Sequence, residues 1–363
     1  MSTEAGFGGA ALGLLLAATL GGVGTYAAAA QEWEPEFVYG VLQPLPDGFP
    51  SGPITLVATG DETSTAGLFA QRLSEYSTTY RPIDVKVEYR EPGKFGDWEA
   101  LKYAAGAEGG SEGYLNVIFA TPDDIIGLHT TPVAAEAGVG LDDLAEVVTL
   151  ESHRYAVIQC KEATWEPSWE ALVEEIRKRP GEIRFAGGEP GDRVDLIFAS
   201  YMQAVGLGSL YDKAAIAHTN VGDVGARTDA VAACDADVTA TDMDQLVTQQ
   251  KGGKVDVILI TGGKKLGKFK DTPTAVDAGI ADDPMSRTMQ VVVPAGVDPL
   301  HVKWLSTLWS RVGKDSYFKA GRVLDQVVNL ANVLGPEESA ALNDTADAKV
   351  GEVTRALGID VAP

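Results

Sequence analysis

The chain has 363 residues, of which 45% are hydrophobic, and it is long enough for a globular protein with two separate cores. Aspartate and glutamate outnumber lysine and arginine by 52 to 29, which gives a formal net charge of −23. Such a charge repels phosphate groups, so it argues against nucleic acids and anionic membrane surfaces as partners, and an acidic exterior helps to keep a protein in solution.

The N-terminal segment is apolar. Residues 6–30 carry no charge, have a leucine-rich centre and end in four alanines. An apolar run followed by small residues is typical of a secretory signal peptide, although residues 1–4 lack the usual basic residue, and a run of about 25 residues also suits a membrane anchor. We expect residues 1–30 to be a cleaved signal peptide, with an uncleaved anchor as the alternative. Either assignment makes the protein periplasmic or otherwise extracytoplasmic.

The next part of the chain alternates strands with helices. Residues 31–52 are rich in proline, glutamate and aromatic residues and are expected to be a linker. Apolar periodicity then predicts strands over 54–58, 83–89 and 114–120, separated by helices over 66–76 and 98–105. This order is typical of a mainly parallel α/β unit.

A second series of elements follows a long β-rich stretch over 147–159. Helices are predicted over 169–178, 194–205 and 225–233, and strands over 183–186, 216–219, 237–240 and 254–261. Further on, we expect a short helix that starts at Pro273, a strand over 291–293, and helices over 302–312 and 337–357.

These elements predict two α/β lobes. Lobe 1 is expected to contain residues 53–151 and 258–363, and lobe 2 residues 152–257. The chain would cross between the lobes near Val157 and Ile258, and these crossings would act as a hinge.

Two loops each join a buried strand to the start of a helix, over 59–65 and 186–193. Free backbone N–H groups and the helix dipole favour an anion or another polar ligand at such a position, which in open α/β sheets lies outside the carboxyl ends of the strands. The alternative is that the glycines of the second loop only form a tight turn. The expected ligand-binding residues come from these loops and from two further strand ends: Gly60, Asp61, Glu62, Thr63, Ser64, Thr65, Thr121, Gly187, Gly188, Gly191, Asp192, Arg193, Thr241 and Asp242.

The sequence offers little for catalysis. The four histidines are scattered without metal-binding spacing. Asp242 and Asp244 resemble a paired-carboxylate or cation site, but we favour the alternative of a solvated helix start, where acids suit the helix dipole. We expect no catalytic residue, no metal and no cofactor. Cys160 and Cys234 have no zinc or redox spacing; we expect two buried free thiols, although they could pair in an oxidising compartment.

One part of the chain resembles a known family. The segment from Asp271 to Gly279 has the pattern Asp-x-Pro-Thr-x-x-acid-x-Gly, residues 294–296 read Pro-Ala-Gly after the next strand, and residues 353–359 form a similar closing helix. This order resembles the extracytoplasmic solute receptors of the tripartite tricarboxylate transporter family, and the resemblance covers residues 53–360. It implies an α/β, two-lobed periplasmic-binding-protein-like (type II) fold with a ligand cleft between the lobes. It also implies a non-enzymatic protein that binds a small polar solute, a carboxylate, with membrane transporter subunits as partners. We further expect a monomer.

The sequence departs from that family in the pocket. Residues 60–65 replace the usual Pro-Gly-Gly, Gly67 replaces an acid, and Asp195 replaces the usual histidine. Added acids would repel a di- or tricarboxylate at close range. Arg193 could attract a ligand carboxylate through a bidentate pair, but we expect it to be tied up by Asp192 or Glu189.

The departures leave two alternatives to a transport role. One is an enzyme on the same fold that uses the carboxylates of Asp61, Glu62, Asp192 and Asp242 in the cleft. The other is a ligand-sensing subunit of a signalling system. Fold alone does not decide among the three.

Overall fold

The computed structural model describes residues 33–93, 96–131, 138–243, 246, 253–280, 285–323 and 333–361. The segment expected to be a signal peptide or anchor lies outside these residues. Within the described part of the chain, no helix combines the length and the apolar character that crossing a membrane requires.

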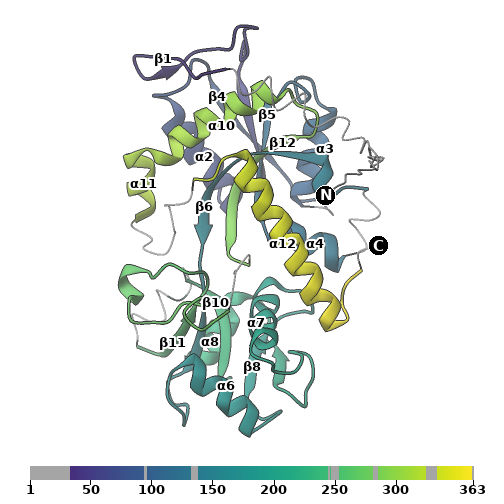
Figure 1. The fold of residues 1–363 in the computed structure, drawn as a ribbon, viewed down its shortest axis with the longest axis vertical. Coiled ribbons are helices and arrows are strands. Elements are labelled where there is room, and N and C mark those ends of the chain that lie inside the picture. The colour runs from purple at the N-terminus through teal and green to yellow at the C-terminus, as the bar shows by residue number, and fades with distance from the viewer. Residues whose placement is uncertain are drawn as a thin grey trace, which may run out of the picture.

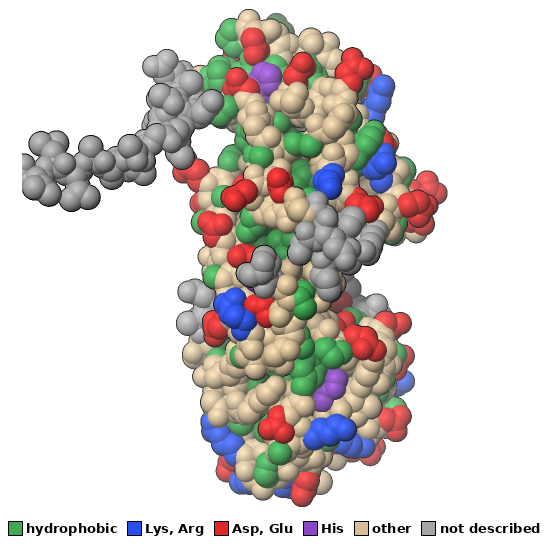
Figure 2. Space-filling model, turned by 90° about the vertical axis from the view of Figure 1, so that its right-hand side faces the viewer, with side chains coloured by type: hydrophobic (Ala, Val, Ile, Leu, Met, Phe, Trp, Pro, Cys, Tyr) green, Lys and Arg blue, Asp and Glu red, His purple; other side chains and the backbone are tan. Residues whose placement is uncertain are grey.

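Among the described residues, all strands but two form two five-stranded sheets at opposite ends of an elongated molecule (Figure 1), and the other two form a small hairpin. We call the part built on the first sheet lobe 1 and the part built on the second sheet lobe 2. Acidic side chains are spread over both lobes on the face that Figure 2 shows, in keeping with the net charge of −23.

The first sheet has the order β4-β3-β5-β12-β6. Strand β3 (Ile54–Thr59) is parallel to β4 (Val85–Arg90) and to β5 (Leu115–Thr121). Strand β12 (Arg287–Pro294) is antiparallel to β5 and to β6 (Leu144–His153), so this sheet receives a strand from late in the chain. Its core packs around the buried rings of Trp304 and Trp309.

The second sheet has the order β11-β7-β10-β8-β9. Strand β8 (Arg184–Gly187) is parallel to β9 (Ala217–Asn220) and to β10 (Val238–Asp242). Strand β7 (Tyr155–Cys160) is antiparallel to β10 and to β11 (Val255–Ile260). All of β11 therefore belongs to the second sheet. A crossing between the lobes had been expected near Ile258, but the chain does not cross within residues 254–261.

Three helices begin after a side chain that caps them. Ser64 precedes α2 (Thr65–Ser77) and accepts the N–H of Gly67 at 3.0 Å, Ser168 precedes α6 (Trp169–Lys178) and accepts the N–H of Ala171 at 3.2 Å, and Asp298 precedes α10 (Pro299–Lys314) and accepts the N–H of Leu300 at 2.8 Å. In lobe 1 the helices are α2 (Thr65–Ser77), α3 (Asp97–Gly106), α4 (Asp123–Thr130), α10 (Pro299–Lys314) and α11 (Ser316–Val323). In lobe 2 they are α6 (Trp169–Lys178), α7 (Arg193–Ala204) and α8 (Val224–Ala232).

The remaining elements differ most from expectation. The predicted linker contains a small hairpin of β1 (Phe37–Val38) and β2 (Val41–Leu42). Two short 3₁₀ helices, Leu141–Asp143 and Gly267–Phe269, were not predicted. The prediction of a helix that starts at Pro273 is wrong, because this segment consists mainly of turns.

The long C-terminal helix α12 (Pro336–Leu357) joins the lobes. It runs from lobe 1 toward lobe 2 (Figure 1) and packs against β6, α4 and α7. Its buried residues Ala346, Val350 and Val353 share one apolar cluster with side chains of the second sheet. The helix therefore serves as a brace across both lobes.

The chain itself crosses between the sheets at two places. Arg154 alone separates β6 from β7, and residues 261–286 lead from β11 back to β12. Arg154 is buried, and its Nη1 lies 3.0 Å from the carbonyl oxygen of Thr261 and 3.5 Å from the hydroxyl of Ser286. One guanidinium thus ties the two crossings together. Val157 and Ile258, expected at the crossings, instead lie inside the second sheet.

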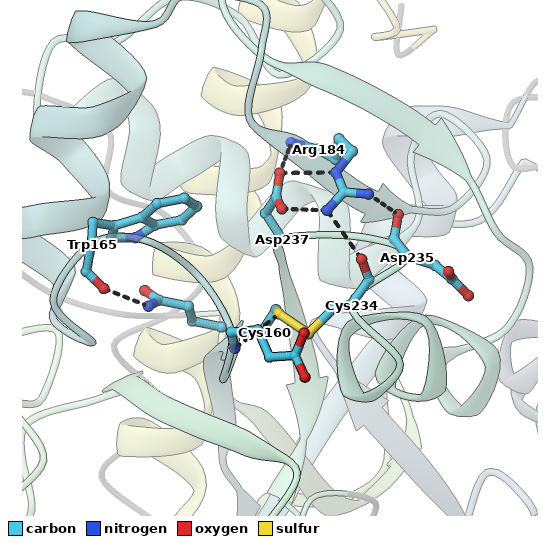
Figure 3. Close-up of a disulfide and its surroundings, with 8 residues drawn as sticks. Cys160, Trp165, Arg184, Cys234, Asp235 and Asp237 are labelled. Carbon is cyan, nitrogen blue, oxygen red and sulfur yellow. Dashed lines mark hydrogen bonds and ion pairs between the residues drawn. A yellow bond between two sulfur atoms is a disulfide. The ribbon is translucent and has the colours of Figure 1, made fainter.

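A disulfide joins Cys160, at the end of β7, to Cys234, just after α8 (Figure 3). Their Cα atoms are 5.2 Å apart. Arg184 holds the same turn by donating to the carbonyl oxygens of Cys234 and Asp235 and to the carboxylate of Asp237. The expectation of two free thiols is wrong, because the fold brings the end of β7 next to the end of α8, and the two cysteines there are 74 residues apart in the chain.

Candidate functional site

The first expected binding loop follows β3 and leads into α2. The carboxylate of Asp61 accepts hydrogen bonds from the N–H of Thr63 at 2.8 Å, the hydroxyl of Thr63 at 2.7 Å and the N–H of Ser64 at 3.0 Å. These bonds, led by the one from the Thr63 hydroxyl, lower the pKa of Asp61. Gly60 has a φ of +97° and donates its N–H to the carbonyl oxygen of Arg90. Several N–H groups of the loop are therefore already hydrogen-bonded, either to the loop's own carboxylate or to a neighbouring strand.

Two other residues of this loop point to solvent. Glu62 and Thr65 are exposed, and the carbonyl oxygen of Glu62 accepts a hydrogen bond from the side-chain N–H of Gln71 at 3.0 Å.

The second expected binding loop lies between β8 and α7. Asp195, which is fully buried, accepts the N–H of Gly188 at 3.0 Å and contacts Nε2 of His218 at 2.7 Å. The hydroxyl of Tyr211 donates to Asp195 at 3.3 Å and accepts the N–H of Gly191 at 3.2 Å. An internal carboxylate therefore occupies the position where backbone N–H groups were expected to hold a ligand anion.

The glycines of this loop are needed for close packing. A Cβ at Gly187 would lie 2.0 Å from Nε2 of His218, and one at Gly188 would lie 2.3 Å from Nη2 of Arg227. Gly191 has a φ of +94°, and a Cβ there would lie 2.9 Å from a side-chain carbon of Thr130 on α4 of lobe 1. The loop of lobe 2 thus touches lobe 1 directly.

Asp192 has a structural role in this loop. It caps α7 by accepting the N–H of Val194 at 2.9 Å, and it accepts two hydrogen bonds from the guanidinium of Arg227 at 2.7 and 2.8 Å. Burial by itself raises the pKa of Asp192, but the hydrogen bonds and charge of Arg227 outweigh burial and leave that pKa lowered. Glu189 accepts a hydrogen bond from the side chain of Asn220 at 2.5 Å.

Arg193 therefore pairs with neither Asp192 nor Glu189, and that expectation is wrong. Its Nη1 donates to the carboxylate of Asp123, the first residue of α4 in lobe 1. Burial lowers the pKa of Arg193, but the carboxylates of Asp123 and Asp242 outweigh this, so the guanidinium keeps its charge. Because α7 belongs to lobe 2, this ion pair spans the two lobes.

Further charged groups surround this pair. Nη2 of Arg193 lies 4.0 Å from the carboxylate of Asp242, and its Cζ lies 4.9 Å from the ring centre of Tyr155. Nε of Arg287 lies 3.3 Å from the same oxygen of Asp123. We call Asp123, Tyr155, Arg193, Asp242 and Arg287 the interlobe cluster.

The ends of the strands position the interlobe cluster. Tyr155 begins β7 and is the register partner of Asp242, which ends β10. Arg287 begins β12, and Asp123 follows β5. The four charged side chains are 18–26% exposed, so solvent reaches them, whereas Tyr155 is fully buried.

The structure brings together Arg193 and Asp242 from the expected site and adds three residues. Asp123 could have been expected from its place after a strand end, but Tyr155 and Arg287 carry no local signal. Thr121 and Thr241 are buried among neighbours: the hydroxyl of Thr121 donates to Asn343 at 2.8 Å, and that of Thr241 lies 2.6 Å from the hydroxyl of Thr228.

A pocket of about 580 Å³ opens at the carboxyl ends of β3 and β4. It is lined by Thr59, Tyr89, Arg90, Glu91, Gly96, Glu99, Ala100 and Lys102. Burial raises the pKa of Asp97, which lies next to this pocket. Burial also raises the pKa of the neighbouring Asp124, and the charge of Asp97 raises that pKa further. A larger groove of about 1220 Å³ lies away from the interlobe cluster, between α10 and the start of α12.

The described residues contain no group of three or more His, Cys, Asp or Glu side chains placed to hold a metal ion. Asp244, expected as a possible partner of Asp242, lies outside the described residues.

Comparison with known proteins gives matches at the level of structure. No protein-family model matches the chain, and no curated protein matches its sequence. Among solved structures, a TctC solute-binding protein from Polaromonas superposes with a TM-score of 0.72 at 16% identity, covering 85% of this chain and 99% of the other. A Rhodopseudomonas palustris protein solved with adipate, Rpa4515, gives 0.62 at 15% identity over 85% and 98%. MatC from Rhodopseudomonas palustris with bound malate gives 0.55 at 17% identity over 84% and 99%. The chain has the two-lobed α/β fold of these TctC-type solute-binding proteins.

Proposed function

We propose that the chain is an extracytoplasmic solute-binding protein. In this proposal it captures a small polar solute that bears a carboxylate between its two lobes and delivers it to a secondary transporter of the tripartite tricarboxylate type. The observation that carries the proposal is the guanidinium of Arg193, which projects from lobe 2 to the start of α4 in lobe 1 and is 18% exposed. A fixed cation between two lobes is suited to a carboxylate, because a guanidinium binds that group through two parallel hydrogen bonds.

The two crossings supply a way to close on a ligand. Arg154, between β6 and β7, and Ser286, just before β12, lie where the chain passes between the sheets, and α12 packs against both lobes. A hinge of a few residues absorbs most of the change in backbone angles during lobe closure. A ligand held by groups from both lobes would favour the closed arrangement by its extra contacts there.

Two further observations support the proposal. Solved structures with the same fold hold adipate and malate, which are small carboxylates. The disulfide between Cys160 and Cys234 fits an extracytoplasmic location, since disulfides persist in oxidising compartments.

A binding experiment on a single variant tests the proposal. Thermal unfolding of the purified protein with a panel of carboxylates and amino acids identifies a ligand, because a ligand at 100 times its Kd stabilises the folded state by about 2.7 kcal/mol. With that ligand, Arg193→Ala should weaken binding by about 2–5 kcal/mol, as truncation of one partner of a buried charge pair does. The control is Arg355→Ala, whose side chain is 63% exposed and lies on α12. Equal affinities of both variants would contradict the role of Arg193, and conversion of the ligand in proportion to protein concentration would favour an enzyme.

A further inference from the structure

The interlobe cluster contains polar atoms that the protein leaves without partners. One carboxylate oxygen of Asp123 faces both Arg193 and Arg287, while the other, Oδ1, is buried and has no hydrogen-bond partner among the described residues. Within the same described part of the chain, Nε of Arg193 and the hydroxyl of Tyr155 are also buried without a partner. Buried polar groups in folded proteins are nearly always hydrogen-bonded, so three such atoms in one place indicate a position for a ligand.

The chemistry of these atoms restricts the ligand. An ionised carboxylate oxygen only accepts hydrogen bonds, and a guanidinium nitrogen only donates them. A group that satisfies Oδ1 of Asp123 must be a donor, and a group that satisfies Nε of Arg193 must be an acceptor. A simple dicarboxylate offers acceptors only, so it would leave Asp123 unsatisfied.

Charge gives a second restriction. The two carboxylates and two guanidiniums of the interlobe cluster cancel, so the cluster has a formal charge of zero. Both nearby loops already hold an internal carboxylate, Asp61 in one and Asp195 in the other, on their backbone N–H groups. A dicarboxylate would add two negative charges to this partly buried region, whereas a zwitterion would add none.

The spacing of the charges gives a third restriction. Arg193 is hydrogen-bonded to Asp123 and lies 4.0 Å from Asp242, and Arg287 lies 3.3 Å from Asp123, so cations and anions alternate at contact distance. A ligand that matches this alternation carries its ammonium and its carboxylate close together, as an α-amino acid does on its single α-carbon.

We propose that the interlobe cluster binds the α-ammonium and α-carboxylate groups of a small amino acid. Arg193 and Arg287 hold the carboxylate, Asp123 and Asp242 hold the ammonium, and the hydroxyl of Tyr155 donates to the carboxylate. This assignment rests on the proposed function, since it names the ligand class of the same cleft.

Pairs of ligands with nearly the same shape distinguish an amino-acid site from a site for carboxylates in general. Thermal unfolding with the twenty common L-amino acids, and with L-lactate, L-malate, succinate and adipate, selects the best amino acid. Calorimetry at pH 7 then compares L-aspartate with L-malate and L-alanine with L-lactate, which exchange only the ammonium for a hydroxyl. Of L-aspartate and L-alanine, we expect the one that binds more tightly to bind at least about tenfold more tightly than its own hydroxy counterpart. Tighter binding of malate, succinate or adipate would overturn the assignment and leave the proposed function standing, and no binding of any compound would overturn both.

Two variants test the roles of single groups. Asp242→Asn keeps the side-chain shape and removes the charge, so it should weaken the amino acid at least about tenfold relative to its hydroxy counterpart. Asp271→Asn, at an exposed carboxylate, is the matched control and should change neither. Equal losses for both ligands in Asp242→Asn would indicate a structural role and contradict the assignment. Tyr155→Phe, which removes only the hydroxyl, should weaken both members of a pair, and unchanged binding of both would contradict the role of Tyr155.

Discussion

Removing the disulfide should destabilise lobe 2 strongly. Cys160 and Cys234 enclose most of that lobe, with a sequence separation of 74 residues. In the loop-closure model, a cross-link over such a loop lowers the entropy of the unfolded chain by an amount worth about 4.5 kcal/mol at 25 °C. This value is about half of the stability of a typical domain, which is roughly 5–15 kcal/mol.

The assay is urea unfolding of the oxidised protein, the reduced protein and the double variant Cys160→Ser/Cys234→Ser. We expect the reduced protein and the double variant to unfold together, at a clearly lower urea concentration than the oxidised protein. Intact-mass measurement after alkylation without reductant should show no labelled cysteine. A difference in unfolding free energy below about 1 kcal/mol would refute the loop-closure reasoning, and full alkylation of the freshly purified protein would refute the disulfide itself.

Three further predictions concern other parts of the fold. Because the folded-state pKa of Asp124 is raised, the folded protein binds more protons than the unfolded chain and loses stability as the pH rises through that pKa. Asp124→Asn removes the charge and should therefore raise the urea midpoint at pH 8 but not at pH 4. An equal effect at both pH values would contradict this reasoning. Arg154→Ala removes charged hydrogen bonds at the crossings and should cost about 1.5–3 kcal/mol in urea unfolding, so an unchanged midpoint would contradict the tie between the crossings. Gly191→Ala should weaken ligand binding more than Gly206→Ala does, because both have positive φ but only Gly191 faces Thr130 across the lobes; equal effects would count against that contact.

Periodicity and capping predicted most of the regular elements. Helix α6 was expected over 169–178 and has those bounds, because Ser168 caps its start and Pro180 and Gly181 follow its end. Strands that are apolar on both faces, such as β5, were equally plain. These signals lie within a few residues of one another, so the sequence alone contains them.

The segment from Asp271 to Gly279 shows where local signals mislead. Thr274 and Asp277 do form the reciprocal bonds of a helix start, at 3.0 and 3.2 Å. The chain then turns at Gly279, which has a φ of +76°, and Thr274 forms a bridge to Ile260. A helix start is present, but the residues that follow it form turns up to Gly279, and one residue of that start is paired with β11.

The candidate site could be predicted only in part. The two loops were located by their place between a strand and a helix, but the partner of Arg193 was not, since its neighbour Asp192 is used by Arg227. Asp123 comes from a distant segment that only the fold brings to Arg193. Such pairings depend on the arrangement of both lobes and leave no local pattern in the sequence.

Small-angle X-ray scattering with and without the best ligand of the thermal screen tests the central claim most directly. If the chain binds a solute between its lobes, its radius of gyration should fall when the ligand saturates it, and the ligand should be recovered chemically unchanged. Arg193→Ala at the same ligand concentration should keep the larger radius. An unchanged radius with saturating ligand, or a ligand consumed during the measurement, would contradict the account.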